Sequence, residues 1–413
     1  MDVKIIPNML KGTVEIPSSK SASHRMLICA GLSDGVSILT GITVSKDISA
    51  TIKALVSMGA EIDVKDDVIT VNGISLPLKE CVADCCESGS TLRFLIPVAA
   101  ALGINATFIG QGKLPERPIT PYLREFKSKG IKFDYNNTMP FSISGKLSAG
   151  EYVLEGDISS QFITGLLFAL PLCEEDSIIK LSSALQSKPY VDMTIDCLKK
   201  FGIRVNEIEN VYLIKGNQKY NAFSSRIEGD YSQAAFFYVA NALGSNVEIL
   251  NLFEESVQGD KKILEILDKM SYTNNNSCQL TSFSVDVGDI PDLVPILAVL
   301  GCFGDNVSEI TNASRLRIKE SDRLTAIATT LNAVGGDVTV IDDRLIIKPI
   351  KEFTGGVVDS FNDHRIVMAM AIASIKSTAP IVIRNALAIE KSYPGFFDDF
   401  NKLGGNANVI HME

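Results

Sequence analysis

The chain of 413 residues is long enough for two or more domains, each with its own hydrophobic core. Hydrophobic residues make up 46% and charged residues 21% of the chain, as in ordinary globular proteins, and the formal net charge is -10. Because the balance is acidic and no broad basic stretch is visible, a nucleic-acid partner is not expected.

The N-terminal segment, the apolar runs and the cysteines bear on location. The opening MDVKIIPNML lacks a charged region followed by a long apolar core, so no signal peptide is expected. Runs such as FITGLLFALPL are shorter than the about 20 residues of a membrane span. The cluster CVADCC has no second Cys/His cluster to complete a zinc site. We therefore expect free thiols, no metal and a cytoplasmic protein.

Two kinds of helical segment alternate along the chain. The first kind has apolar residues three or four apart, which is typical of an amphipathic helix. Five of these segments break at a glycine, which can end a helix in the left-handed conformation, and alternating residues then predict a strand. The fourth has Ser271 at that place. The six segments are 50–64, 121–135, 192–206, 261–275, 325–339 and 395–409, and the glycines are Gly59, Gly130, Gly202, Gly335 and Gly404.

The second kind of segment is apolar almost all round, which predicts a buried helix. These segments are 21–32, 90–103, 160–172, 232–244, 292–304 and 363–374, and each opens with a residue suited to a helix cap, namely Ser21, Ser90, Ser160, Ser232, Asp292 or Asp363. The two kinds recur together every 64 to 72 residues, counted from the markers at 59, 130, 202, 271, 335 and 404. Chance similarity is the alternative, but fixed periodicity predicts a repeat architecture with short strands in each repeat.

The stretch PSSKSASHR, from Pro17 to Arg25, shows what gathers at the buried helix starts. Serines cap helices well, but Lys20 and Arg25 lie near the positive end of the helix dipole, where cations are disfavoured. A bound anion would offset that repulsion; a solvated first turn is the alternative. Cations recur near these starts at Lys20, Arg25, Arg93, Lys319, Arg323 and Arg365. A locally basic centre in an acidic protein favours small, multiply anionic metabolites as ligands.

Four motifs in the first half of the chain place polar groups at turns. In ESGSTLR, Gly89 allows a ligand close to the backbone amide, although a plain turn glycine fits as well. In GKLPERP, Arg117 lies between two prolines, which suits bidentate anion binding or a surface loop. DISSQF, with Ser159, Ser160 and Gln161, is either a cap or a binding turn. QSKPY, with Ser187 and Tyr190, reads alone as a surface turn.

The second half carries the densest charges. In DIPDLVP, Asp292 is either a cap or a base beside a cationic pocket. In RLRIKESDRL, the alternation of Leu316 and Ile318 predicts a strand-like stretch that enters a helix and aims Lys319, Glu320 and Arg323 into a site; a solvated helix face is the alternative. NDHR and EKSYPGF add Arg365 and Lys391, and His364 is either a base or structural. No GxxxxGK[ST] loop is present, which argues against a nucleotide phosphotransferase.

In this order, PSSKSASHR, ESGSTLR, ERP, SSQF, SKPY, IPD, KESDR, NDHR and a late lysine resemble the 5-enolpyruvylshikimate-3-phosphate synthase family over essentially the whole chain. The resemblance implies an α/β enolpyruvyl transferase fold of six βαβαββ repeats, three per domain, with a ligand cleft between the domains. The implied first domain is residues 1–18 plus 228–413, and the second is residues 19–227.

The resemblance implies transfer of the enolpyruvyl group of phosphoenolpyruvate to the 5-hydroxyl of shikimate 3-phosphate, by a monomer without cofactor or metal. The implied catalytic residues are Asp292 as base, Glu320 as acid, Lys20 and Lys319. The implied shikimate 3-phosphate contacts are Lys20, Ser21, Arg25, Ser159, Ser160, Gln161, Ser187, Tyr190, Asp292 and Lys319. The implied phosphoenolpyruvate contacts are Lys20, Gly89, Arg117, Gln161, Arg323, Arg365 and Lys391.

Some residues depart from the family's usual pattern. Glu87 stands where many relatives have asparagine, Phe94 where proline is common, and Arg315 where some relatives have asparagine on the substrate. These departures bear on the response to the inhibitor glyphosate. Two rival functions remain. UDP-N-acetylglucosamine enolpyruvyl transferases usually carry a reactive cysteine in the loop matched by QGKLPERP, which has none here. A non-catalytic anion-binding protein of this fold would not need Asp292, Lys319 and Glu320.

Overall fold

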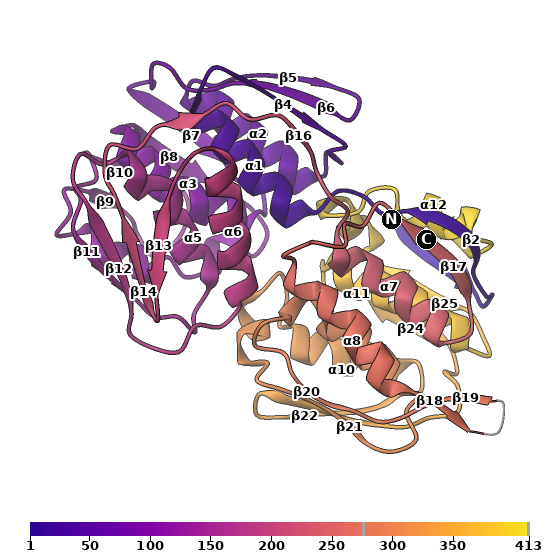
Figure 1. The fold of residues 1–413 in the computed structure, drawn as a ribbon. Coiled ribbons are helices and arrows are strands. Elements are labelled where there is room, and N and C mark those ends of the chain that lie inside the picture. Colours follow the sequence, from indigo (N-terminus) through magenta and orange to yellow (C-terminus); the bar gives the residue numbers. More distant parts are fainter. Residues whose placement is uncertain (275–276, 411–413) are drawn as a thin grey trace. The chain divides into compact units, whose positions relative to one another are not determined.

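The computed structural model describes residues 1–274 and 277–410, and the chain divides into two compact units (Figure 1). Unit 1 comprises Met1–Pro17 and Gly229–Glu413, and unit 2 comprises Ser18–Glu228. Each unit has its own cluster of buried hydrophobic side chains. Two cores are what a chain of this length predicts. Within the described ranges, no helix is both long and apolar enough to cross a membrane.

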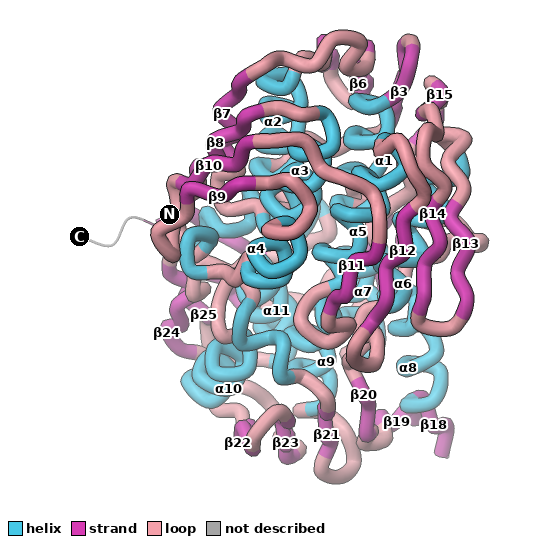
Figure 2. The backbone as a smooth tube through the Cα atoms, turned by 90° about the vertical axis from the view of Figure 1, so that its left-hand side faces the viewer, coloured by secondary structure: helices cyan, strands magenta, loops and turns pink. Residues whose placement is uncertain are grey.

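One βαβαββ repeat recurs through the chain, as the sequence predicts. A complete copy in unit 2 consists of β7 (Glu80–Asp84), α3 (Gly89–Leu102), β8 (Asn105–Ile109), α4 (Thr120–Phe126), β9 (Lys132–Asp134) and β10 (Phe141–Ser144). Its sheet has the order β7-β8-β10-β9, in which the first pair is parallel and the other two are antiparallel. Figure 2 shows these four strands side by side. The alternation of Phe141 and Ile143 with serines turns one face of β10 toward the core.

The other two sheets of unit 2 repeat this strand order, β16-β4-β6-β5 and β11-β12-β14-β13. Their strands are β16 (Ser225–Arg226), β4 (Val36–Thr40), β6 (Val68–Asn72), β5 (Glu61–Lys65), β11 (Glu151–Leu154), β12 (Ser177–Leu181), β14 (Val211–Ile214) and β13 (Val205–Ile208). A short parallel pair joins β3 (Ser33–Asp34) to β15 (Tyr220–Asn221).

Unit 1 has two sheets of the same order, β20-β21-β23-β22 and β24-β25-β1-β26, and the third repeat contributes two separate pairs, β2-β17 and β18-β19. The strands are β20 (Ser284–Asp286), β21 (Ser308–Thr311), β23 (Arg344–Lys348), β22 (Asp337–Ile341), β24 (Gly356–Asp359), β25 (Ile381–Arg384), β1 (Asp2–Ile6), β26 (Asn406–Ile410), β2 (Lys11–Glu15), β17 (Asn246–Leu250), β18 (Ser271–Asn274) and β19 (Ser277–Leu280). The strand β1 therefore closes a sheet made from the end of the chain.

In two repeats, the strand that comes just before the buried helix pairs with a strand of the unit that does not contain that helix. The strand β2 precedes α1 (Lys20–Leu32) in sequence but pairs with β17 in unit 1, whereas β16 precedes α7 (Tyr231–Ala242) but pairs with β4 in unit 2. Backbone hydrogen bonds fix both departures: Ser19 N donates to Glu228 O within unit 2, and Asp230 N donates to Pro17 O within unit 1. The change of unit thus occurs next to the buried helices that follow.

The buried helices form where the sequence predicts them: α1 (Lys20–Leu32), α3, α5 (Ser160–Ala169), α7 (Tyr231–Ala242), α9 (Val294–Gly301) and α11 (His364–Ala373). The expected caps are wrong except at Asp363. The residues whose side chains accept from first-turn amides are Ser19, Ser88, Ser159, Asp230 and Asp363. The helices α1, α3, α5 and α7 begin at the expected cap residue or one residue before it, so that residue lies inside the first turn. Before α9, the turn η4 (Pro291–Leu293) follows Ile290, whose side chain makes no cap.

The amphipathic helices are also confirmed, as α2 (Lys46–Met58), α4, α6 (Lys188–Lys200), α8 (Lys262–Met270), α10 (Arg323–Ala333) and α12 (Phe396–Lys402). The five glycines that follow them have φ between 85° and 116°, the left-handed region that glycine adopts without steric cost. After α8, β18 begins at once with Ser271. The last residue of that predicted segment, Asn275, lies outside the described residues.

The strand-like prediction for residues 315–318 is wrong, because Ser314–Ile318 forms the 3₁₀ helix η5. The preceding strand β21 ends at Thr311, and Asn312 turns the chain away from the sheet with a φ of 59°. Alternating residues over so short a stretch fit a 3₁₀ turn as well as a strand. The other 3₁₀ turns are η1 (Leu114–Glu116), η2 (Leu170–Leu172), η3 (Gly259–Lys261), η6 (Ser374–Lys376) and η7 (Ala386–Lys391).

Candidate active site

Six residues take the same place in successive repeats, and four of them, Ser21, Gln161, Asp292 and Arg365, were expected at the site. The six are the second residues of the turns or helices that open the six buried segments: Ser21, Ser90 and Gln161 in unit 2, and Ser232, Asp292 and Arg365 in unit 1. Side chains at this position lie beside the backbone amides of the first turn, which have no partner within the helix. The helix dipole adds positive potential there, so each start favours an anionic group.

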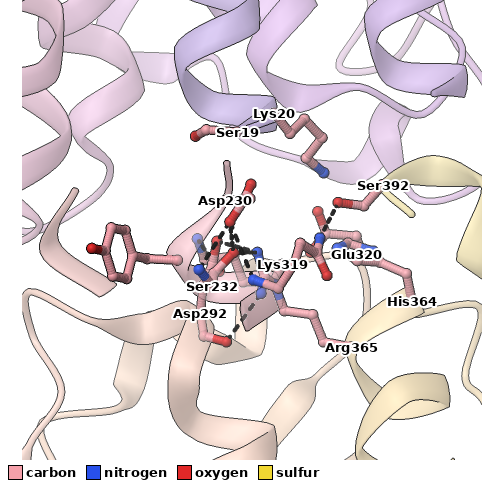
Figure 3. Close-up of polar contacts among 12 residues, drawn as sticks. Ser19, Lys20, Asp230, Ser232, Asp292, Lys319, Glu320, His364, Arg365 and Ser392 are labelled. Atoms are coloured by element: carbon pink, nitrogen blue, oxygen red, sulfur yellow. Dashed lines mark hydrogen bonds and ion pairs between the residues drawn. The ribbon is translucent and has the colours of Figure 1, made fainter. Parts of the chain in front are cut away.

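In unit 1, Asp292 lies among cations (Figure 3). Its Oδ1 accepts from Nη1 of Arg323 at 2.9 Å, and its Oδ2 accepts from Nη2 of Arg365 at 2.8 Å. The ammonium of Lys319 is 3.9 Å from Oδ1. Burial alone would raise the pKa of Asp292, but the three cations hold that pKa well below its usual range. The carboxylate is therefore fully ionised at neutral pH.

For Lys319, burial affects the pKa more than the neighbouring charges do. Burial lowers its pKa to about 8, although the nearby Asp292 acts to raise it and Arg323 to lower it further. An ammonium with a pKa of about 8 can both bind an anion and exchange a proton, and such a group is typical of a catalytic site.

Arg323 is the centre of the ion pairs in unit 1 and only 1% of its side chain is exposed. Its Nε donates to Asp363 Oδ2 at 2.7 Å and its Nη2 to Glu320 Oε2 at 2.7 Å. Sequence reasoning treated Asp363 only as a helix cap and missed this ion pair. The signal was present in NDHR, because a buried carboxylate beside a required arginine needs a cationic partner.

Two more cations lie at the start of α11. Nη2 of Arg365 also donates to Ser232 Oγ at 3.1 Å, so three of the equivalent second positions meet in unit 1. Nζ of Lys391, a buried side chain at the end of η7, donates to the Asn362 carbonyl at 2.6 Å. His364 is buried, with Nδ1 3.9 Å from Asp363 Oδ1, which favours the structural reading of this histidine.

In unit 2, Arg25 is buried against uncharged groups. Nε donates to Thr194 Oγ1 at 2.9 Å, and Nη1 and Nη2 donate to the carbonyls of Ser21 and Tyr190 at 2.8 Å each. The guanidinium also lies 5.3 Å from the ring centroid of Phe94. Burial lowers the pKa of Arg25 to about 10, which still leaves it charged at neutral pH.

A second group in unit 2 surrounds Gly89. A Cβ at this position would lie 2.6 Å from Nη1 of Arg117 and 3.5 Å from Oε1 of Gln161. Gln161 accepts from Nη1 of Arg93 at 2.7 Å and donates to Ser90 Oγ at 3.0 Å. The absence of a side chain at Gly89 therefore lets Arg117 lie against the first turn of α3. Arg93, which the sequence placed among the cations but not in the site, belongs to this group.

The remaining expected residues of unit 2 lie at other helix starts. Lys20 pairs with Asp47 at 3.1 Å. The Ser159 hydroxyl is used in capping α5, next to the buried Ser160. Ser187 precedes α6 with a φ of 58°, and its hydroxyl does not cap that helix. Gly89, Arg117 and Gln161 therefore lie together in one group. Lys20 pairs with Asp47 instead, and Ser187 lies just before α6.

The repeats and these charged helix starts define an α/β enzyme for anionic substrates. A family model described as EPSP synthase (3-phosphoshikimate 1-carboxyvinyltransferase) matches residues 5–400. Similar proteins include the 3-phosphoshikimate 1-carboxyvinyltransferase of Clostridium novyi (strain NT), 47% identical over 98% of both chains, and that of Clostridium kluyveri, 48% identical over 98% of this chain and 97% of the relative. The chain belongs to the EPSP synthase family.

A solved structure has the same fold. An EPSP synthase from Acinetobacter baumannii superposes with a TM-score of 0.83 over 99% of this chain and 100% of that chain, at 24% sequence identity. The six-repeat fold expected from the sequence is therefore confirmed.

Proposed function

We propose that the helix starts described above bind and activate the substrates of a 3-phosphoshikimate 1-carboxyvinyltransferase, the shikimate-pathway activity of the family to which this chain belongs. The donor is phosphoenolpyruvate and the acceptor is the 5-hydroxyl of shikimate 3-phosphate. Both substrates are anionic at neutral pH, which matches the basic helix starts of an otherwise acidic chain.

Arg25 is the main phosphate ligand proposed for shikimate 3-phosphate. Its acceptors are uncharged, so its charge is left for an anion to balance. The other proposed contacts of this substrate are Lys20, Ser21, Ser159, Ser160, Gln161, Ser187, Tyr190, Asp292 and Lys319.

Phosphoenolpyruvate has two anionic ends, and the proposal gives each its own cations. The Gly89 amide, Arg117, Gln161, Lys20 and Lys391 bind its phosphate. Arg323 and Arg365 bind its carboxylate. The observation that carries this assignment is that one carboxylate, that of Asp292, already lies across both guanidiniums. Paired arginines recognise carboxylates through such charge-assisted bonds.

The chemistry is an addition followed by an elimination. Asp292 takes the proton of the 5-hydroxyl while that oxygen bonds to C2 of phosphoenolpyruvate, and Glu320 donates a proton to C3, which receives the electron pair of the double bond. The C2–O bond to phosphate then breaks and C3 loses a proton, which restores the double bond as the enol ether. Lys20 and Lys319 stabilise the charge that develops on oxygen and on the departing phosphate.

Phosphate release from phosphoenolpyruvate, with either shikimate 3-phosphate or UDP-N-acetylglucosamine as acceptor, tests the activity. Release is expected only with shikimate 3-phosphate. Asp292→Asn and Glu320→Gln should each reduce kcat by roughly 10²-fold or more, the usual contribution of an acid or base. Asp322→Asn is the matched control, because Asp322 lies in the same KESDR motif but caps α10. Near-normal turnover in either catalytic variant removes that residue from the assignment.

We also propose that the protein is a cytoplasmic monomer. Free thiols, which a reducing compartment favours, are present at Cys29, Cys81, Cys85, Cys86, Cys173, Cys197 and Cys302. Sedimentation of the purified chain measures the oligomeric state, and fractionation of cells measures location. A stable dimer or a secreted protein would contradict the proposal.

A further inference from the structure

The carboxylate of Asp292 occupies the pair of guanidiniums that the proposed function assigns to a substrate. Oδ1 accepts from Arg323 at 2.9 Å and Oδ2 accepts from Arg365 at 2.8 Å, so each oxygen meets a different arginine. A small-molecule carboxylate bound by the same two arginines would make the same pattern of bonds. Asp292 and the carboxylate of phosphoenolpyruvate therefore compete for one place, a conclusion that rests on the proposed function.

The two arginines are held from behind by another carboxylate. Asp363 Oδ2 accepts from Nε of Arg323 at 2.7 Å, and Asp363 Oδ1 accepts from the backbone amide of Arg365 at 3.0 Å. The Asp363 side chain has 0% exposure and is fixed as the N-cap of α11. Because these bonds do not involve Asp292, the guanidinium of Arg323 and the backbone of Arg365 keep their support when the Asp292 side chain moves. The guanidinium of Arg365 keeps its bond to Ser232 Oγ at 3.1 Å.

Asp292 is the exchangeable member of the two carboxylates. Its side chain is 17% exposed, against 0% for Asp363. It lies in a turn of three residues, η4, whose first residues receive no side-chain cap. A rotation of this side chain toward solvent breaks two ion pairs and leaves the helices in place, whereas a rotation of Asp363 would also uncap α11.

We propose that the carboxylate of phosphoenolpyruvate displaces Asp292 from Arg323 and Arg365, and that only the displaced Asp292 acts as the base. The exchange replaces one carboxylate by another, so it makes and breaks ion pairs but no covalent bond. While Asp292 bridges the guanidiniums, its oxygens are committed to charged donors and accept a proton poorly. In its present place Arg365 and Arg323 both act to lower the pKa of Asp292, so its proton affinity rises when the ligand's carboxylate takes these two cations. Binding of the donor thereby activates the base that deprotonates the acceptor.

Equilibrium binding of two probes tests the exchange without turnover. Phosphoenolpyruvate is compared with vinyl phosphate, which lacks the carboxylate, by titration calorimetry in the absence of shikimate 3-phosphate. Asp292→Asn removes the competing charge, so the affinity ratio of phosphoenolpyruvate to vinyl phosphate should rise by roughly tenfold or more, as expected for a bond between charged groups. Asp322→Asn is the matched control, since Asp322 pairs with Arg317 and not with either guanidinium, and it should change the ratio by less than about threefold. An unchanged ratio in Asp292→Asn overturns the exchange.

A second measurement uses the unmutated protein, so it does not require that a variant folds. With aspartate labelled with ¹³C at Cγ, one carboxylate resonance should shift when phosphoenolpyruvate is added and stay in place when vinyl phosphate is added. A spectrum in which both probes give the same changes overturns the proposal. Phosphate release in the unmutated protein is measured separately. If phosphoenolpyruvate moves the resonance but no phosphate is released with shikimate 3-phosphate, the proposed function fails and the exchange stands.

Discussion

In unit 1 the buried guanidiniums of Arg323 and Arg365 meet carboxylates, whereas in unit 2 the guanidinium of Arg25 meets a hydroxyl, two backbone carbonyls and an aromatic ring. The effect on the pKa differs accordingly. Burial acts to lower the pKa of Arg323, but Asp363, Glu320 and Asp292 raise it well above its usual value. For Arg25, burial dominates and lowers the pKa to about 10.

The difference shows two ways in which a repeat architecture prepares for an anion. Unit 1 carries an internal anion, so its cations are balanced and fixed before a ligand binds. In unit 2 the acceptors of Arg25 are uncharged, and the proposed function assigns the phosphate of a ligand to balance its charge. An internal ion pair adds positional order and is costly to break, while a buried charge with neutral partners costs stability and adds affinity. Two substitutions and one change of pH test this difference between the paired cations of unit 1 and Arg25 of unit 2.

The largest effect is expected for Asp363→Ala in unit 1. Loss of this carboxylate leaves Arg323 buried without its main partner and uncaps α11, so the free energy of unfolding should fall by about 3–5 kcal/mol, together with most of the turnover. Asp322→Ala is the matched control, because Asp322 also caps a helix and pairs with an arginine but is 37% exposed. Its expected loss is about 1 kcal/mol. Equal losses in a denaturant titration would show that capping, and not the buried ion pair, is the important term.

A smaller change in stability is expected for Arg25→Met in unit 2. The methionine retains apolar packing against Phe94 and removes a costly buried charge, so the free energy of unfolding should change by less than about 1.5 kcal/mol. The KM for shikimate 3-phosphate should nevertheless rise by roughly 10²-fold, because one or two charge-assisted bonds to its phosphate are lost. A steady-state assay and a denaturant titration measure both quantities. A destabilisation as large as that of Asp363→Ala would contradict the contrast between the units.

The smallest effect concerns Lys319 and pH. Since its pKa is about 8 in the folded protein, its charge is lost as pH rises through 8, and affinity for shikimate 3-phosphate should fall by at most tenfold per pH unit above that value. Stability responds with the opposite sign. The ordinary value is 10.5, so between about 8 and 10.5 the unfolded chain binds more protons, and this group makes the folded state more stable as pH rises. Lys319→Met should abolish both trends in calorimetry and in denaturation at pH 7 to 10.

Periodicity predicted both families of helices, because burial of an apolar face leaves a direct trace in the residue pattern. The position of a cap leaves a weaker trace. In PSSKSASHR several serines suit the cap, and only the backbone decides that Ser19 takes it and Ser21 lies in the first turn. The 3₁₀ turn η5 was not predicted for a related reason, since a few alternating residues fit more than one conformation.

The NDHR motif indicated that Asp363 needs a cationic partner, but the sequence could not identify that partner. Arg323 and Asp363 are 40 residues apart and meet only because successive repeats place their helix starts side by side in unit 1. The motifs named Arg323 but gave no means to choose its partner among 49 acidic residues. The domain boundaries expected near residues 18 and 227 stay a prediction, as do the substrate contacts. The structure divides the chain into compact units at Pro17–Ser18 and Glu228–Gly229.

The position of β1 has a consequence for synthesis of the chain on the ribosome. Val3 pairs with Val409, so Val3 waits for a residue that is made 406 residues later. At about 5–20 residues per second, this wait lasts roughly 20–80 s. Unit 2 is contiguous from Ser18 to Glu228 and has all its strands once β16 has emerged. During the remaining time the leading segment, with its apolar Val3 and Ile5, has no sheet to join and is exposed to chaperones and proteases. The sheet of unit 1 that contains β1 is thus completed only when β1 and β26 meet.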